Sequence, residues 1–256
     1  MTKDFLIIGN WKLNGTKKHV LSFFKKLDKI KDELSNLKIV IAIPIIYTGF
    51  VYKRLINSKN IFLSAQNVDT NIYGAFTGEI SIKMLKDLNI KYVILGHSER
   101  RFFHKETNEI VSEKFFISYK NKITPIICVG ENIEEFKMNK SYEVCLSQIK
   151  LIIKKFGIKS LRKVVIAYEP IWSIGTGYCA NPNHVIKIIK KIKNYIKKNN
   201  YEISNSIIYQ YGGSVNHNNI IDFLDNKIIN GFLIGNASLK FNSFYKIIKK
   251  ILGKLK

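Results

Sequence analysis

The stretch Val164-Val165-Ile166-Ala167-Tyr168-Glu169 is a short apolar run that ends on a carboxylate. It lacks the polar alternation of a strand with one solvated face, so it suits a strand buried on both faces of a parallel sheet. Seven further runs share this character: Phe5–Gly9, Ile39–Ile43, Ile61–Ala65, Tyr92–Gly96, Pro125–Val129, Ile207–Tyr211 and Gly231–Gly235. With Val164–Tyr168 they make eight predicted strands.

The longer stretches between these runs carry apolar residues at helical spacing. Thr16 is predicted to be the N-cap of a helix whose apolar face holds Val20, Phe23, Phe24, Leu27, Ile30 and Leu34. Asn181-Pro182 predicts an N-cap followed by proline at the first helical position. That helix ends at Asn199-Asn200, and its predicted buried face holds Ile186, Ile189, Ile192 and Ile196.

Eight strands that alternate with helices predict an α/β fold that closes into a single (β/α)8 barrel, a TIM barrel. No linker rich in Pro, Gly and Ser divides the chain, so residues 1–256 are expected to form one domain. A doubly wound open sheet is the structural alternative. Against it, the first strand–helix junction, Gly9–Gly15, lacks the G-x-G-x-x-G pattern that binds dinucleotides in such sheets.

The chain is strongly basic, with 42 Lys and Arg against 19 Asp and Glu and a formal net charge of +23. Such a charge first suggests a nucleic-acid or membrane partner. However, 38 of the basic residues are Lys and four are Arg, whereas base readout and bidentate phosphate recognition favour Arg. We interpret the charge mainly as drift in composition and expect no specific nucleic-acid partner.

Cys128, Cys145 and Cys179 are odd in number and widely spaced. They indicate a reducing compartment and provide no disulfide or zinc framework. The N-terminal apolar run is too short for a signal peptide, and no run approaches 18 apolar residues. These features predict a soluble, cytoplasmic protein that has no membrane partner.

Polar residues gather where the predicted strands end. Six runs are followed by such residues: Asn10 and Lys12, His97 and Glu99, Glu131, Glu169, Gly212-Gly213-Ser214, and Gly235-Asn236. In a parallel barrel all these ends share the face on which barrel enzymes carry their active sites. Each residue alone also has an ordinary explanation, such as a surface lysine, a structural histidine or a turn. Cys128 alone is most simply a small buried apolar residue.

Taken together, these residues lie in motifs that match a known family in order and spacing. The motifs are Asn10–Gly15, Leu95–Arg101, Glu169–Gly177, Tyr211–Val215 and Gly235–Leu239. Over essentially the whole chain the sequence resembles the triosephosphate isomerase family, and Gly74–Glu79 is similar to that family's dimer loop.

The resemblance implies interconversion of dihydroxyacetone phosphate and glyceraldehyde 3-phosphate through an enediolate, in glycolysis and gluconeogenesis. It implies that Glu169 is the proton acceptor and His97 a neutral electrophile. Lys12 would supply a fixed positive charge, Asn10 a hydrogen bond to the developing oxyanion, and Glu99 a partner for Lys12.

The resemblance also implies a phosphate site and a lid, with no cofactor or metal. Backbone N–H groups of Gly175, Ser214, Gly235 and Asn236 would bind the phosphate, aided by a short helix after the eighth strand. Ile171–Gly177 would close over the substrate on hinges at Pro170–Trp172 and Tyr178–Ala180. Closure of the lid would press Ile174 and Leu233 against Glu169. Tyr211 and Ser214 would hold the closed lid, and Glu131 would hold Trp172 when the lid is open.

Three features depart from the family pattern. Gly235-Asn236 replaces the usual Gly-Gly, and we expect Asn to be tolerated because it adopts left-handed backbone more readily than most residues. Ser173 stands where Ala is usual, and Tyr178-Cys179-Ala180 is an uncommon hinge.

The resemblance further implies a homodimer in which Thr77 reaches towards Asn10 and Lys12 of the other subunit.

Two other functions are alternatives to the isomerase. One is a basic binding protein with a vestigial site, which the charge favours and an isomerase assay would test. The other is a different phosphate-binding barrel, which would not be expected to carry His97, Glu169 and the lid together.

Overall fold

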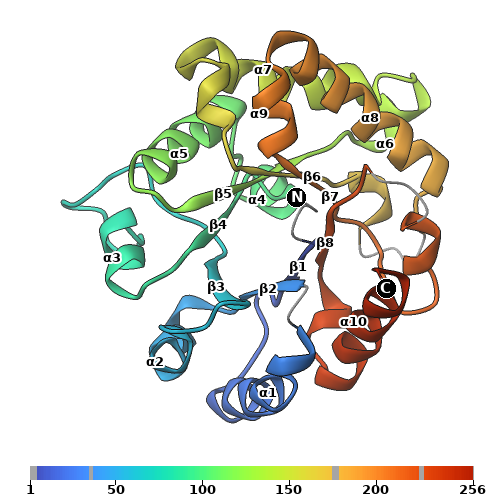
Figure 1. The fold of residues 1–256 in the computed structure, drawn as a ribbon. Helices are drawn as coiled ribbons and strands as arrows, with labels where there is room; N and C mark the ends of the chain where they lie inside the picture. Colours follow the sequence, from blue (N-terminus) through green and yellow to red (C-terminus); the bar gives the residue numbers. More distant parts are fainter. Residues whose placement is uncertain (1–4, 35–36, 175–178, 225–227, 256) are drawn as a thin grey trace.

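The computed structural model describes residues 5–34, 37–174, 179–224 and 228–255. Its centre is a closed barrel in which eight parallel strands follow one another in chain order (Figure 1). The strands are β1 (Phe5–Asn10), β2 (Leu37–Ala42), β3 (Ile61–Ala65), β4 (Tyr92–Leu95), β5 (Thr124–Val129), β6 (Val165–Tyr168), β7 (Ile208–Tyr211) and β8 (Gly231–Ile234). The predicted (β/α)8 barrel is confirmed, and each predicted strand overlaps an observed one.

Helices surround the barrel (Figure 1). The α-helices are α1 (Lys17–Lys29), α2 (Tyr52–Leu55), α3 (Ile82–Asp87), α4 (Ser98–Phe103), α5 (Asn108–Lys120), α6 (Ile133–Lys137), α7 (Ser141–Phe156), α8 (Pro182–Asn199), α9 (Tyr201–Ser206) and α10 (Phe241–Leu255). The 3-10 helices are η1 (Lys31–Leu34), η2 (Ile45–Phe50), η3 (Ile158–Leu161), η4 (Ile171–Ser173), η5 (Ile220–Phe223) and η6 (Asn236–Ser238).

Barrel closure depends on a close approach between β1 and β8. These strands pair in parallel, with Leu6 opposite Gly231. A Cβ atom at Gly231 would lie 1.9 Å from the carbonyl oxygen of Leu6. Because only glycine lacks this atom, Gly231 is the residue that lets the last strand join the first.

The strands have two buried faces, as the absence of polar alternation predicted. Inward-facing residues from β1, β2, β4, β5, β6 and β8, among them Ile8, Val40, Ile126 and Leu233, form an inner cluster. A larger cluster fills the space between the strands and the surrounding helices. The core therefore consists of a filled barrel and a surrounding apolar layer.

The helix starts are confirmed, and one helix end and one face need correction. Thr16 Oγ1 accepts the His19 N–H at 3.2 Å, and the Asn181 side chain caps α8. The first helix stops at Lys29 because Ile30 leaves helical dihedral angles (φ −109, ψ 7), and η1 continues the chain to Leu34. The buried face of α8 includes Val185 and Ile188, while Ile186 is only half-buried.

Within the described ranges, no helix is long and apolar enough to cross a membrane.

Candidate active site

The end of β1 places Asn10 and Lys12 at the mouth of the barrel. Asn10 is buried, and its Oδ1 accepts the backbone N–H of Lys12 at 3.0 Å. Lys12 has a left-handed backbone (φ +53), which costs a non-glycine residue about 1 kcal/mol or more. Gln66 holds this turn by donating to the carbonyl oxygens of Lys12 (2.8 Å) and Ala42 (3.0 Å).

The orientation of Lys12 is fixed by an ion pair. Lys12 Nζ lies 2.5 Å from Glu99 Oε1, which confirms the predicted Lys12–Glu99 contact. The role of Gln66 was missed from the sequence, because an amide in the loop after β3 gives no local signal of which carbonyl it binds.

His97 is the N-cap of α4, and this position determines its tautomer. Its Nδ1 lies 3.2 Å from the backbone nitrogen of Glu99 and accepts that N–H. A backbone N–H can only donate, so Nδ1 carries no proton and the ring proton lies on Nε2. Nε2 lies 3.4 Å from Glu169 Oε1. The geometry therefore fits the neutral imidazole that the resemblance implied.

Glu169 follows β6 and is only 2% exposed. Its Oε2 accepts the Ser98 N–H at 3.3 Å. Two glycines leave it room: a Cβ atom at Gly212 would lie 2.9 Å from Glu169 Cγ, and one at Gly130 would lie 1.8 Å from the Glu169 carbonyl oxygen. The carboxylate is therefore held by a backbone donor in a tight, nearly dry position.

Cys128 on β5 is a neighbour of Glu169 that the sequence did not reveal. It is buried as predicted, and it belongs to the inner cluster, close enough to Glu169 for the carboxylate to affect its pKa. Burial raises the pKa of the Cys128 thiol, and the adjacent negative charge of Glu169 adds to this. The alternation of side chains along β5 could have predicted this position, because Ile126 and Cys128 are two residues apart and both point inward.

These side chains face a pocket of about 360 Å³. Most of the predicted site residues line it: Asn10, Lys12, His97, Glu169, Ile174, Ser214, Leu233, Gly235 and Asn236. Glu99 lines an adjoining pocket that shares Asn10, Lys12 and His97. Gly175 lies outside the described residues.

The turns after β7 and β8 form the end of the pocket that contains Ser214, Gly235 and Asn236. Gly235 lies beside Lys12, since a Cβ atom there would be 3.5 Å from Lys12 Cε. The predicted short helix after β8 is η6, which begins at Asn236. The backbone of Asn236 is not left-handed, so the reason given for its tolerance is wrong. A 3-10 start suits any ordinary residue, and no positive φ is required there.

Both ends of the predicted lid are anchored. Trp172 Nε1 donates to Glu131 Oε1 at 3.0 Å, and the Ala180 N–H donates to the Tyr211 hydroxyl at 3.3 Å. Ser214 Oγ donates to the Ser173 carbonyl at 2.8 Å. Contacts that the resemblance assigned to open and closed lids therefore occur together.

The Tyr211 anchor depends on its neighbours. A Cβ atom at Gly213 would lie 2.1 Å from the Tyr211 hydroxyl oxygen. Burial raises the pKa of Tyr211, so the hydroxyl keeps its proton. Of the predicted hinge, Cys179 and Ala180 are described, and Tyr178 lies outside the described residues.

In the described part of the chain, no group of three or more His, Cys, Asp or Glu residues could hold a metal ion. The site instead offers a buried carboxylate, an imidazole N–H and an ammonium group around one pocket. These groups can move a proton and stabilise an oxyanion. The class of protein follows: a barrel enzyme built for acid–base chemistry.

Comparison with known proteins identifies the family within this class of barrel enzymes. The family model for triosephosphate isomerase matches residues 5–251. A triosephosphate isomerase of Buchnera aphidicola subsp. Acyrthosiphon pisum is 50% identical over 96% of this chain and 97% of its own length. One from Salmonella newport is 42% identical over 95% of each chain. The chain belongs to the triosephosphate isomerase family, as the sequence motifs indicated.

Proposed function

We propose that Glu169 is the base that moves the proton in the family's interconversion of dihydroxyacetone phosphate and glyceraldehyde 3-phosphate. The observation that carries this is the pairing of Glu169 with His97 across 3.4 Å at the wall of the pocket. One side chain can accept a carbon-bound proton while the other donates a hydrogen bond to the adjacent substrate oxygen.

In this mechanism Glu169 removes a proton from one carbon and returns it to its neighbour. His97 Nε2–H, the Asn10 amide and the Lys12 ammonium stabilise the negative charge that develops on the enediolate oxygen. The buried position of Glu169 supports this role, because excluding water removes competing hydration of the carboxylate. Ile174 and Leu233, which line the same pocket, would complete this exclusion when the lid closes.

The substrate phosphate would bind at the far end of the pocket. Backbone N–H groups of Gly175, Ser214, Gly235 and Asn236 are the proposed donors, and η6 adds the N-terminal end of a short helix. The Lys12 ammonium beside Gly235 gives this end a positive charge.

A coupled isomerase assay on the wild type and Glu169→Ala tests the base. Removal of a general base is expected to lower kcat by about 10²- to 10⁴-fold. The exposed Glu143→Ala is the matched control, since it removes a surface carboxylate that lines neither pocket of the site, and it is expected to keep wild-type turnover. Equal activity in Glu169→Ala and the wild type would refute the assignment.

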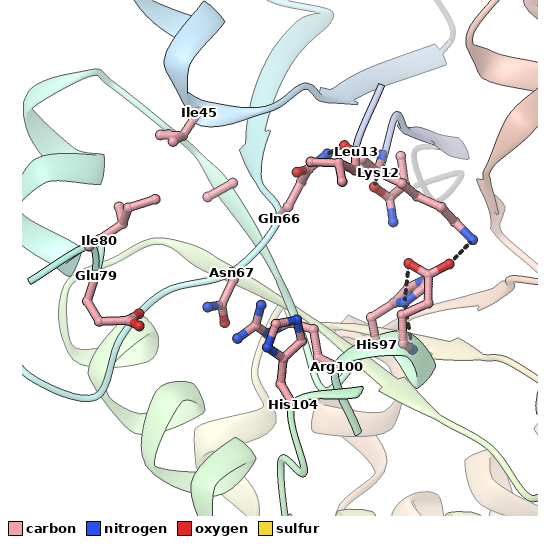
Figure 2. Close-up of a pocket in the computed structure, with 14 residues that line it drawn as sticks. Lys12, Leu13, Ile45, Gln66, Asn67, Glu79, Ile80, His97, Arg100 and His104 are labelled. Carbon is pink, nitrogen blue, oxygen red and sulfur yellow. Dashed lines mark hydrogen bonds and ion pairs between the residues drawn. The ribbon is translucent and has the colours of Figure 1, made fainter. Parts of the chain in front are cut away.

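We also propose a homodimer formed through the loop Gly74–Glu79. All six residues of this loop are exposed in the single chain. A pocket of about 400 Å³ lies beside Lys12, Gln66 and His97 (Figure 2). Thr77 of a second copy would enter this pocket and support Asn10 and Lys12 from outside.

Exposed apolar side chains support the dimer. Leu13, which lines this pocket, is 97% exposed, and Tyr73 and Phe76 of the loop region are 81% and 47% exposed. Large exposed apolar groups of this kind mark an interaction surface. Light scattering at assay concentration is expected to give a dimer, and Thr77→Arg a poorly active monomer. A fully active wild-type monomer would overturn the proposal.

The proposed location is the cytoplasm. Cys128, Cys145 and Cys179 are free thiols, which suits a reducing compartment. Cell fractionation with antibodies to the protein is expected to recover it with cytoplasmic markers, and recovery with membranes would argue against this location.

A further inference from the structure

A buried polar cluster lies below the first residues of the lid. Its centre is Glu131, which is 0% exposed. Glu131 Oε1 accepts hydrogen bonds from the Tyr168 hydroxyl (3.0 Å), Trp172 Nε1 (3.0 Å) and Ser141 Oγ (3.1 Å). Trp172 is the donor that belongs to the lid, so Glu131 connects the lid's first turn to the body of the barrel.

His184 on α8 adds a further link to this cluster. Its Nε2 lies 3.1 Å from the Tyr168 hydroxyl oxygen. Tyr168 has one hydroxyl proton, and the ionised Glu131 carboxylate is the stronger acceptor for it. His184 Nε2 must then be the donor, so the chain of hydrogen bonds runs from His184 to Tyr168 and from Tyr168 to Glu131.

Ring packing holds His184 in this position. The His184 ring meets Phe136 of α6 edge-on, with centroids 5.1 Å apart. Phe136 also packs against Trp172 at 4.3 Å, and His184 lies 6.4 Å from Trp172. The imidazole is therefore linked to the lid's first turn in two ways: through the hydrogen bonds of Tyr168 and Glu131, and through ring packing with Phe136 and Trp172.

We propose that His184 is a positioning residue for the lid: its neutral ring donates to Tyr168, directs the Tyr168 proton at Glu131, and so fixes Trp172. The inference rests on the proposed lid function of Ile171–Gly177. It assigns to α8 a side chain that sets the geometry of a hinge without touching substrate.

The surroundings of His184 keep its ring neutral. Burial lowers the pKa of His184, Glu131 from the loop after β5 raises it, and Lys187 one turn along α8 lowers it. β6 presents the Tyr168 hydroxyl, and α6 and η4 present the uncharged rings of Phe136 and Trp172. The net pKa is below the ordinary value of 6.5.

Protonation would change the hinge. A cationic His184, whose Nε2 is 3.9 Å from Glu131 Oε1, would compete with Trp172 for that oxygen. The lid's first turn would loosen as the pH falls through the pKa of His184, which lies below the ordinary value of 6.5.

The first test compares two substitutions in the full-length protein. His184→Gln keeps an N–H donor without a titratable group, and His184→Leu removes the donor. Loss of one such hydrogen bond corresponds to about a fivefold effect. His184→Leu is expected to lower kcat by about fivefold with KM for the triose phosphate little changed, and His184→Gln is expected to restore most of it.

The second test does not depend on a change in catalytic activity. A protonated histidine near an indole quenches its fluorescence, so the wild type is expected to show a fluorescence decrease as the pH falls through the lowered pKa of His184, and His184→Gln is expected to lack it. The other tryptophan, Trp11, stacks on His19 at 4.5 Å and contributes equally to both proteins. The difference between the two titrations therefore belongs to the pair of His184 and Trp172.

Wild-type kcat in His184→Leu, or identical fluorescence titrations in the wild type and His184→Gln, would overturn the proposal. If His184→Leu does not fold, the fluorescence comparison alone decides. Failure of the proposed base would appear separately, as full activity in Glu169→Ala, and would leave these two readouts unaffected.

Discussion

His97 Nε2 lies 3.4 Å from Glu169 Oε1, although the two residues follow different strands, β4 and β6. The Glu99 N–H on the other side of the imidazole fixes the proton on Nε2, and the Ser98 N–H holds the other Glu169 oxygen. The proposed electrophile and the proposed base are therefore oriented by one helix start, that of α4. Small displacements of either side chain should affect turnover more than stability.

Gly212→Ala is expected to lower kcat by about tenfold or more while the protein stays folded. The new Cβ atom would lie 2.9 Å from Glu169 Cγ and push the carboxylate away from His97, and misplacement of about 1 Å can cost as much as a hundredfold. Steady-state kinetics and thermal unfolding measure the two effects. Gly253→Ala is the matched control, because nothing lies within 4 Å of its Cβ position. Equal kcat in both variants would contradict the crowding argument.

Ile174→Ala is expected to lower kcat by about tenfold with Glu169 untouched. Ile174 lines the pocket beside Glu169 and Leu233, and a shorter side chain would admit water to the carboxylate. The substrate deuterium isotope effect should rise as proton abstraction becomes more rate-limiting. Unchanged turnover would leave Glu169 as the base and discard the apolar clamp.

Asn236→Gly is expected to lower KM for the triose phosphate by about twofold to threefold, since glycine allows the backbone to approach an anion closely. Relief of strain is not the reason, because Asn236 is not left-handed. Inhibition by inorganic phosphate should strengthen in parallel. A KM equal to that of the wild type would show that the Asn236 side chain does not weaken phosphate binding.

Glu106 should make stability depend on acid pH. Burial opposes its ionisation, but hydrogen bonds from Lys114 (2.5 Å) and Arg100 (2.6 Å) outweigh this and hold the pKa of Glu106 below 4.5. A carboxylate with a lowered pKa stabilises the fold above 4.5, and this contribution disappears as the pH falls through the lowered pKa.

Glu106→Gln is therefore expected to lose about 3 kcal/mol of unfolding free energy at pH 7, since it breaks a buried ion pair. The difference from the wild type should narrow as the pH falls below 4.5. Urea unfolding at pH 7, 5 and 3 measures both quantities. A difference that stays constant across this range would show that ionisation of Glu106 does not contribute.

The sequence alone predicted the barrel and the residues that gather at its mouth. Runs such as Val164–Tyr168 have no polar face, and this local property requires a strand covered on both sides. The positions of Lys12, His97 and Glu169 directly after such runs then placed them on one face, because parallel strands share their carboxyl ends.

Only the tertiary structure decided the contacts between side chains that are far apart in the sequence. The space left by Gly130 and Gly212 and the position of the Cys128 thiol against Glu169 depend on register between neighbouring strands. The link from His184 to Glu131 depends on how α8 packs on β6. Chain periodicity fixes which face a side chain takes, whereas distances between segments far apart in sequence are set only when the barrel closes.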